Sequence, residues 1–251
     1  MLTVLLVIPS LRAGGAEKVF TLLATNLSRD RFKLYLAVLD LSNAVFLQDL
    51  PSDLEIIDLN ITRARYSFIK LLRLIHDIKP DILFTTLWYI NIGIGLLKFL
   101  LPSRTKHIAR ETSIVSQRIR VEKQSGLWEI MYKISYSLIP NIVCQSRWMM
   151  DDLSQNYSIP SSKITVINNP LDVDDINRRA QEPCPFIETL KLSNDLVFVF
   201  VGRLSIAKGC DTLLQAWSSI RPEKSHLVLV GDGPERKNIQ REIVHLNIEN
   251  L

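Results

Sequence analysis

Cysteine is scarce in this sequence. Three cysteines occur among 251 residues, at positions 144, 184 and 210. Zinc sites built from cysteine place their ligands in close pairs, and small secreted domains use many cysteines as disulfides. The wide spacing shows neither pattern, and it favours a protein of the reducing cytoplasm.

Signals for secretion and membrane insertion are also missing. The opening segment MLTVLLVIPS has no charged start and no small-residue cleavage site, so we do not expect a signal peptide. Residues 82–101 form the one candidate for a membrane span, but Asn91, Lys98, a pair of threonines and two glycines interrupt it. We expect a strand and a short helix there.

The charge is unevenly distributed. Hydrophobic residues make up 47% and charged residues 22% of the chain, which is typical of a globular protein, and the net charge is +4. Residues 60–125 contain twelve basic and four acidic residues, a net +8, so the remainder carries −4. Such a segment either attracts an anionic membrane or nucleic acid, or is an ordinary solvated surface. The basic residues are not interleaved with aromatic ones, which argues against nucleic acid.

Short apolar runs alternate with amphipathic segments through the first two thirds of the chain. The alternation predicts a parallel, doubly wound α/β sheet, because strands covered on both faces are apolar throughout. We expect strands at 2–8, 32–39, 54–59, 81–86, 106–110, 141–145 and 163–167. We expect helices at 16–27, 68–78, 92–101 and 147–157, and a long helical region that runs to about 138 with a break at Gly126.

A change in composition separates the last third. The residues after the Asn-Asn-Pro at 168–170 are acidic and proline-containing, which predicts a linker. A strand at 196–201, a helix at 211–220, a strand at 226–230 and a helix from about 235 to 246 follow. We therefore divide the chain into a domain at 1–170, a linker at 171–194 and a partial domain at 195–251.

Two loops have the character of anion sites. Arg203 follows the apolar run at 196–201, and Lys208 comes just before the predicted helix. Ligands of open α/β sheets bind at the carboxyl ends of strands, and helix N-termini favour anions. Gly14 and Gly15 precede the first helix in the segment LRAGGAEK, which is neither a G-x-G-x-x-G fingerprint nor a P-loop. Solvated loop charges and a structural Gly-Gly turn are the alternative interpretations.

Four segments resemble, in order and spacing, the family-4 nucleotide-sugar glycosyltransferases: GGAEKV, VINNPLDVDD, VGRLSIAKGCDTLLQAW and LVLVGDGPERKNI. The resemblance implies the GT-B architecture, here a complete Rossmann-like N-terminal domain plus the first β-α-β-α of a second one. It implies a retaining hexosyltransferase that takes a nucleotide-diphospho-sugar donor and a saccharide or lipid-linked acceptor. No metal or other cofactor is implied, and the expected location is the cytoplasm or the inner face of the membrane.

The resemblance also assigns roles to the two loops. It implies that Arg203 and Lys208 contact the donor diphosphate, whose charge grows as the glycosidic bond breaks. Gly14 and Gly15 would meet the same diphosphate from across the cleft through backbone N–H groups. The pair Asp232 and Gly233 falls in the nucleotide-side turn, either shaping the cleft or contacting the nucleotide.

The sequence departs from the family pattern in two places that bear on catalysis. The family's E-x7-E pair is absent and would lie beyond Leu251, since the last carboxylate is Glu249. Many members have a histidine where this chain has Leu87–Trp88. The catalytic residue is therefore unknown. Glu111 is the nearest polar candidate to face the acceptor, although a structural salt bridge is the favoured role.

The second domain stops after two strands and two helices. A six-stranded Rossmann sheet would need about four more strands, on the order of 100 residues. Right-handed crossovers put both helices on one face, so we expect an exposed apolar patch, poor solubility of the second half and little transferase activity. A non-catalytic acceptor-binding module is the alternative. An NAD-dependent oxidoreductase is a third possibility, disfavoured by the missing G-x-G-x-x-G.

Overall fold

The computed structural model describes residues 1–61, 67–124, 126–184, 195–220 and 224–248. The chain divides into two compact units, residues 1–173 and 174–251. Residues 62–66 and 125 of the basic segment, and residues 185–194 of the predicted linker, lie outside the described residues. The division between the units falls within the predicted linker, a few residues after position 170.

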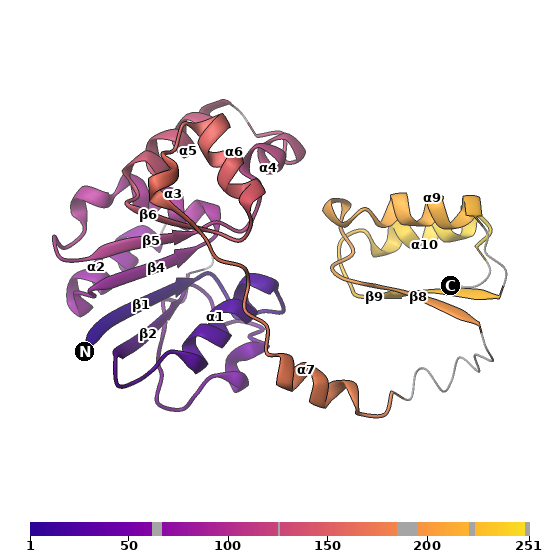
Figure 1. Ribbon diagram of the computed structural model, residues 1–251, viewed down its shortest axis with the longest axis horizontal. Coiled ribbons are helices and arrows are strands. Elements are labelled where there is room, and N and C mark those ends of the chain that lie inside the picture. The colour runs from indigo at the N-terminus through magenta and orange to yellow at the C-terminus, as the bar shows by residue number, and fades with distance from the viewer. Residues whose placement is uncertain (62–66, 125, 185–194, 221–223, 249–251) are drawn as a thin grey trace. The chain divides into compact units, whose positions relative to one another are not determined.

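The described part of the first unit is built on one seven-stranded sheet (Figure 1). All neighbouring strands pair in parallel, in the order β3-β2-β1-β4-β5-β6-β7. The strands are β1 (Leu2–Ile8), β2 (Phe32–Val38), β3 (Glu55–Asp58), β4 (Ile82–Thr86), β5 (Lys106–Arg110), β6 (Asn141–Cys144) and β7 (Ile164–Val166). The seven predicted strands are confirmed within a residue or two of their ends.

Helices cover both faces of this sheet, as the nearly all-apolar strand β1 requires. On β1, Leu6 packs toward α1, whereas Leu5 and Val7 pack toward α2 and α3. Helices α4, α5 and α6 bury a further cluster over β5 and β6. The helices of this unit are α1 (Gly15–Asn26), α2 (Ser67–Ile78), α3 (Trp88–Leu96), α4 (Val115–Val121), α5 (Gly126–Leu138) and α6 (Arg147–Tyr157). Short 3-10 turns lie at η1 (Phe46–Asp49), η3 (Lys98–Leu100) and η4 (Ser161–Lys163).

One helix of the first unit differs from the prediction, and the predicted break near Gly126 is present. The helix expected at 92–101 begins at Trp88 and ends at Leu96, after which η3 follows. Its residues Ile90, Ile92 and Ile94 are all buried, and a helix that is apolar on several sides has no periodicity to mark its start. The long helical region is two helices. Gly126 is the first described residue of the second helix, and the first one ends at Val121.

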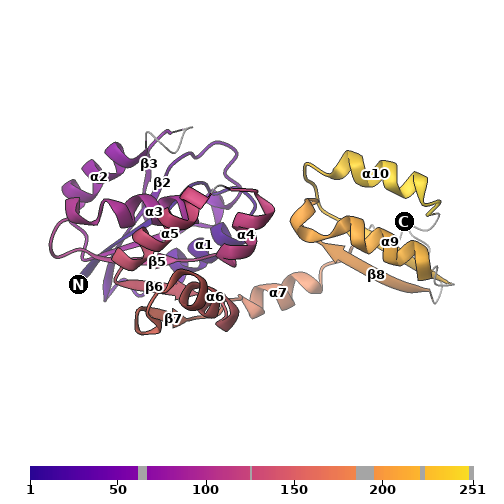
Figure 2. The ribbon, with the colours of Figure 1, turned by 90° about the horizontal axis from the view of Figure 1, so that it is seen from above.

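The second unit contains a two-stranded parallel sheet with two helices on one face. Its elements are β8 (Leu196–Val201), η5 (Ile206–Lys208), α9 (Cys210–Ile220), β9 (Ser225–Val230) and α10 (Arg236–His245). Figures 1 and 2 show α9 and α10 side by side on the same side of the strands. Leu214 of α9 and Ile239 of α10 share one apolar cluster with Leu227 of β9. The prediction that both helices cover one face is confirmed.

The opposite face of this small sheet is apolar and uncovered by the described residues. Val199 is 59% exposed and Val201 is 74% exposed, although both belong to the apolar run of β8. The predicted exposed patch is therefore present.

The predicted linker is not wholly irregular. It contains α7 (Val173–Ala180), in which Asp175 pairs with Arg178 and Arg179. The helix was missed because its two apolar residues, Val173 and Ile176, make too short a pattern and are themselves exposed. Among the described residues, every helix is too short or too polar to cross a bilayer.

Candidate functional site

The loop between β8 and α9 presents two cations. Arg203 comes two residues after the end of β8, and Lys208 ends the η5 turn. Gly209 follows with a φ of +65°, the left-handed conformation that glycine adopts at least cost, and α9 begins at the next residue. Both side chains are exposed, and neither has a hydrogen bond or ion pair with the residues that the structure describes. The loop therefore holds two cations available to an anion at a helix start.

Two backbone hydrogen bonds join the turn between β9 and α10 to this loop. The Leu204 amide donates to the Asp232 carbonyl at 3.0 Å, and the Glu235 amide donates to the Leu204 carbonyl at 3.1 Å. The contact is so close that a Cβ on Gly233 would lie 2.2 Å from the Leu204 oxygen. Gly233 is thus required by the approach of the two loops, and it sets the shape of the strand-end surface in this unit.

Asp232 makes its own local contacts. Its carboxylate accepts from the Gly233 amide at 2.8 Å and lies 3.6 Å from the Arg236 guanidinium. The side chain is exposed, so these contacts leave its outer edge open. Both earlier interpretations, shaping the cleft and contacting a ligand, remain predictions.

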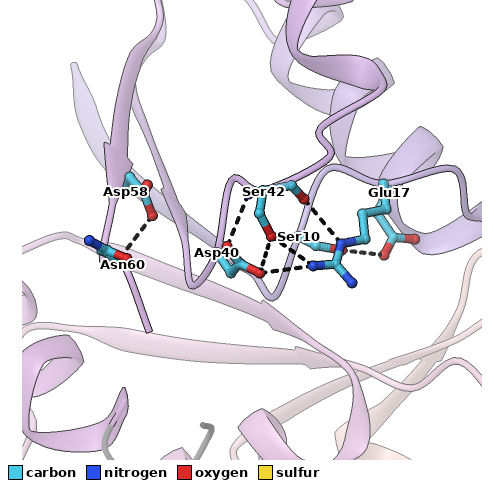
Figure 3. A network of polar contacts seen from close by, with 7 residues as sticks. Ser10, Glu17, Asp40, Ser42, Asp58 and Asn60 are labelled. Atoms are coloured by element: carbon cyan, nitrogen blue, oxygen red, sulfur yellow. Dashed lines mark hydrogen bonds and ion pairs between the residues drawn. The ribbon is translucent and has the colours of Figure 1, made fainter. Parts of the chain in front are cut away.

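In the first unit, polar residues follow β1, β2 and β3 where these strands end (Figure 3). After β1, the Ser10 hydroxyl donates to Glu17 at 3.2 Å. After β2, Asp40 accepts from Ser42 and from the Arg12 guanidinium, which hold the pKa of its carboxyl below the usual value. The carboxyl edge of this sheet is therefore a polar surface, on which Arg12, Asp40 and Ser42 form one bonded group and Ser10 and Glu17 form a separate pair.

Glu17 lies over the glycine turn. Gly14 is the N-cap of α1, in an extended conformation, and its missing side chain leaves room for the Glu17 carboxylate. A Cβ on Gly14 would lie 2.2 Å from a Glu17 oxygen, whereas a Cβ on Gly15 would meet nothing within 4 Å. A carboxylate at this end of a helix is favoured by the helix dipole. It also means that the anion-favouring end of α1 already has an anionic neighbour.

Further along the same edge lies a buried arginine. Arg110 ends β5 and is only 3% exposed. Its guanidinium donates to Thr86 at the end of β4, at 3.3 Å, and to Asn169 after β7, at 2.8 Å. The Asn169 amide in turn donates to Gln145 at 2.9 Å. These bonds fix the start of the interdomain segment to the carboxyl edge of the sheet, while burial lowers the pKa of Arg110.

Glu111 is fully buried and does not reach solvent. Its carboxylate accepts from the Thr112 amide at 2.8 Å, from the Ser113 amide at 3.2 Å and from the Tyr136 hydroxyl. Burial raises the pKa of this carboxyl, and the three donors oppose that shift. No salt bridge joins Glu111 to a base among the described residues. The predicted salt bridge is therefore wrong for the part of the chain that the structure describes, and hydrogen bonds instead hold Glu111 at the turn before α4.

The network around Glu111 continues into the core. Tyr136 accepts from Asn91, whose amide also donates to the Arg110 carbonyl, and this second bond fixes the amide orientation. Asn91 then accepts from Thr85, so the Thr85 oxygen must accept from His107 at 2.9 Å. His107 therefore donates from Nε2, and its Nδ1 has no partner among the described residues. Burial lowers the pKa of His107 to about 3.

Comparison with known proteins decides the family. The chain matches Glycosyltransferase Family 4 over residues 13–175, and Glycosyl transferases group 1 over residues 186–251. This protein belongs to Glycosyltransferase Family 4. The family resemblance predicted from the sequence is thereby confirmed.

Individual relatives of this family-4 chain are distant. The chain is 25% identical, over 96% of its length, to the N-acetylgalactosamine-N,N'-diacetylbacillosaminyl-diphospho-undecaprenol 4-alpha-N-acetylgalactosaminyltransferase of Campylobacter jejuni. It is 22% identical, over 72% of its length, to an uncharacterized glycosyltransferase of Methanocaldococcus jannaschii. It spans 65% and 46% of the lengths of these two proteins. The crystal structure of Anabaena HepE in complex with UDP and glucose has the same fold, with a TM-score of 0.75, 19% identity, and coverage of 100% of this chain and 68% of that one.

The predicted site residues of this family-4 chain fall in two groups. Arg203 and Lys208 lie together with the Asp232–Gly233 turn in the second unit, and Gly14, Gly15 and Glu111 lie at the carboxyl edge in the first. A grip on one diphosphate from both groups stays a prediction, because the groups belong to separate units.

Sequence reasoning missed the polar partners in the first unit. Glu17 stands inside the GGAEKV segment, and Asn169 stands inside the segment VINNPLDVDD. Arg110 and Gln145 each follow or end a predicted strand, which places them at the ligand edge by topology alone. Their position at the carboxyl ends of predicted strands is the sequence signal that could have identified them as site residues.

Proposed function

We propose that this chain contributes to retaining transfer of a hexosyl group from a nucleotide-diphospho-sugar to a saccharide or lipid-linked acceptor, without a metal, in the cytoplasm. The observation that carries the proposal is the exposed pair Arg203 and Lys208, fixed at a strand end beside the start of α9. Two cations at a helix N-terminus, both without a partner in the described part of the chain, suit a diphosphate better than any neutral ligand.

The chemistry requires positive charge at that point. When the bond between the sugar and the diphosphate breaks, the leaving nucleoside diphosphate gains negative charge on its terminal phosphate oxygens. Fixed cations stabilise that charge in the transition state more than in the bound donor, and so lower the barrier. Arg203 offers a planar fork for two oxygens, and Lys208 offers a compact charge.

The names of the relatives suggest which donor and which acceptor to test first. HepE is described in complex with UDP and with UDP-glucose, which favours a uridine donor for this chain. The Campylobacter jejuni relative is named for an acceptor linked to diphospho-undecaprenol, which favours a lipid-linked acceptor. We therefore place a UDP-sugar and a lipid diphosphate saccharide first among the substrates to test.

Calorimetric titration tests the donor site directly. UDP-sugar, GDP-sugar and NAD are titrated into the unmodified chain, into Arg203→Ala and into Lys208→Ala. We expect a UDP-sugar to bind and each substitution to weaken binding by about 10- to 100-fold, as charged hydrogen bonds to an anion predict. Lys237→Ala, an exposed lysine on α10, is the matched control and should bind like the unmodified chain. Binding of NAD alone, or equal affinity in all four proteins, would remove the proposal.

Turnover is a separate matter. Because the chain spans 65% of the length of the Campylobacter jejuni relative, and the described residues leave one face of the β8–β9 sheet uncovered, we expect weak transfer by the chain as printed. Transfer is compared with that of the same chain extended to a full second domain. Equal turnover by both would show that the printed chain is already sufficient.

A further inference from the structure

We propose that Trp88 and Trp128 form a platform on which an acetamido sugar of the acceptor stacks. The inference rests on the proposed function, because it names the part of a saccharide acceptor that the first unit binds. Trp88 is the first residue of α3, and Trp128 belongs to the first turn of α5. We call this pair the tryptophan platform.

The tryptophan platform lies at the carboxyl edge of the first sheet. Only Leu87 separates Trp88 from Thr86, the last residue of β4. Helix α5 leads into β6, so its first turn lies at the edge where the parallel strands end, and α3 and α5 pack side by side (Figures 1 and 2). Ligands of open parallel sheets bind at this edge.

Tyr89 connects the platform with the glycine turn before α1. Its ring meets the Trp88 ring edge to face, with 5.5 Å between the ring centroids. Burial, and secondly the carboxylate of Glu17, raise the pKa of Tyr89 to about 12. Because Glu17 also lies against Gly14, the start of α3 and the start of α1 belong to the same stretch of the edge.

The connection between β4 and α3 is strained. Leu87 has a φ of 69° and a ψ of 137°, outside the regions that a bulky side chain adopts at low cost. Such conformations persist only where the surrounding contacts impose them, and they concentrate at ligand and active sites. Here the strained residue lets α3 begin one residue after the end of the strand. It thereby holds Trp88 at the strand end.

The orientation of the Trp88 ring is fixed by its neighbours. The Arg118 guanidinium lies over the ring, with 4.2 Å between Cζ and the ring centroid, and Trp128 meets the ring edge to face at 4.9 Å. Arg118 itself donates to Glu122 at 3.0 Å and to the Tyr132 hydroxyl. A ring that is already held in one orientation loses little conformational freedom when a ligand stacks on it.

The bonding of this group is incomplete. The Nε of Arg118 is buried and has no hydrogen-bond partner among the described residues. A buried donor without an acceptor is costly unless water or a ligand completes it. The two tryptophans are also only half-buried, whereas the tyrosines of the same cluster, Tyr132, Tyr136 and Tyr157, are buried. The group therefore keeps accessible ring surface and an unsatisfied donor, as a binding site does.

An acetamido sugar matches both features. Its acetamido group has an apolar methyl and a planar amide, which lie flat on an indole ring. Its carbonyl oxygen is an acceptor for a donor such as the Nε of Arg118. A hexose without this group offers less apolar surface and no carbonyl. A uracil ring also stacks on aromatic side chains, so uridine is included in the test.

Saturation-transfer NMR on the printed chain tests the platform. The ligands are methyl glycosides of N-acetylglucosamine and N-acetylgalactosamine, the matched glucoside and galactoside, and uridine. Dissociation constants come from the dependence of the signal on ligand concentration. We expect at least one acetamido sugar to bind better than its matched hexoside and better than uridine, with transfer to its acetamido methyl protons. Absence of binding by both acetamido sugars, or stronger binding of uridine, would overturn the proposal.

Variants locate the binding at the platform. Trp88→Leu should weaken binding of the acetamido sugar by about tenfold, and Trp88→Phe, which keeps a ring, by less than about threefold. Trp148→Leu, on α6 and 77% exposed, is the control and should bind like the unmodified chain. Shielding of buried Cys144 from a thiol reagent checks the fold of each variant. Should Trp88→Leu expose Cys144, Trp128→Phe takes its place, again with weaker binding expected. Equal affinity in the platform variants would overturn the proposal.

Arg118→Met tests the contact with the amide. It keeps an unbranched side chain over the ring and removes the guanidinium. We expect the preference for the acetamido sugar over its hexoside to fall by about threefold or more, an effect that loosened packing alone would not produce. Arg120→Met, an exposed arginine of the same helix, is the control. An unchanged preference in Arg118→Met would overturn the assignment of the acetamido group.

UDP-sugar titration of the same proteins separates this inference from the proposed function. Normal UDP-sugar binding without binding of an acetamido sugar removes the platform and leaves the donor site standing. Binding of the acetamido sugar without binding of UDP-sugar keeps the platform and removes the proposed donor site.

Discussion

The two units treat their strand ends differently. In the first unit, Glu17, Arg110 and Glu111 are bonded to partners from other segments of the same unit. In the second unit, Arg203 and Lys208 have no such partner among the described residues. The polar side chains at the carboxyl edge of the first sheet are already hydrogen-bonded within their unit, whereas Arg203 and Lys208 at the second sheet remain available to a ligand. An anionic ligand therefore gains most from the second unit, and the first unit contributes a rigid surface.

The same contrast exists in the sheets. Strand β8 is apolar throughout and β1 is apolar except for Thr3, yet Val7 is 0% exposed and Val199 is 59% exposed. An apolar run therefore indicates that a strand is suited to burial on both faces. It does not indicate that other residues of the unit cover both faces of that strand.

The largest expected effect concerns acid stability of the first unit. His107 has a pKa of about 3 when folded and an ordinary value near 6.5 when unfolded. Between these values the unfolded chain binds a proton that the folded chain does not, so the free energy of unfolding falls as the pH falls. We expect a loss of about 2 kcal/mol between pH 6.5 and 5 from this group alone, at about 1.4 kcal/mol per pH unit.

His107→Gln should remove that part of the acid sensitivity, because the amide stays neutral. Unfolding of the first unit is followed by the reactivity of Cys144 toward a pyridyl disulfide, which reacts in acid, with exposed Cys184 as internal standard. His76→Gln, an exposed histidine of the same unit, is the control. The buried carboxyl of Glu111 contributes to the pH dependence in the opposite direction. Because its pKa is raised in the folded state, the free energy of unfolding falls as the pH rises. An unchanged pH profile in His107→Gln would mean that the ring is not held neutral.

A matched pair of substitutions compares the two sheets. Val7→Thr places a hydroxyl in the covered face of β1 and should cost about 1–3 kcal/mol of unfolding free energy. Val199→Thr places the same group on the bare face of β8 and should change stability by less than about 0.5 kcal/mol. Protection of Cys144 reports the first unit, and protection of Cys210 reports the second. Equal costs would show that the face of β8 is covered in solution, for example by a second copy.

The sequence was most informative where packing is repetitive. The strand at 2–8 could be located because burial on both faces leaves almost only apolar residues between loops. The start of the helix at 88–96 could not be predicted for a related reason. A helix that is buried on several sides has no helical period of apolar residues. Helix α7 was missed because ion pairs of Asp175, and not an apolar face, accompany it.

The residues of the candidate site likewise fall into those that local sequence patterns predict and those that they do not. Glycines and cations in short motifs could be named from the sequence, because the loop geometry that they serve is local. The bond between Arg110 and Asn169 joins residues 59 apart, and the bond between Tyr136 and Glu111 joins residues 25 apart. Such partners are set by the order of strands in the sheet, which local patterns do not contain.

The smallest expected effect tests the glycine turn. A methyl group on Gly15 meets open space, and alanine is the better helix former at the first position of α1. Gly15→Ala should therefore raise the stability of the first unit by up to about 1 kcal/mol. If a diphosphate approaches this backbone, the same substitution should weaken UDP-sugar binding a few-fold, as measured by titration. Gly126→Ala, at the start of α5 with equally open space, is the control that should keep donor affinity. Unchanged affinity in Gly15→Ala would leave the donor held by the second unit alone, and the two edges would then differ in role as well as in structure.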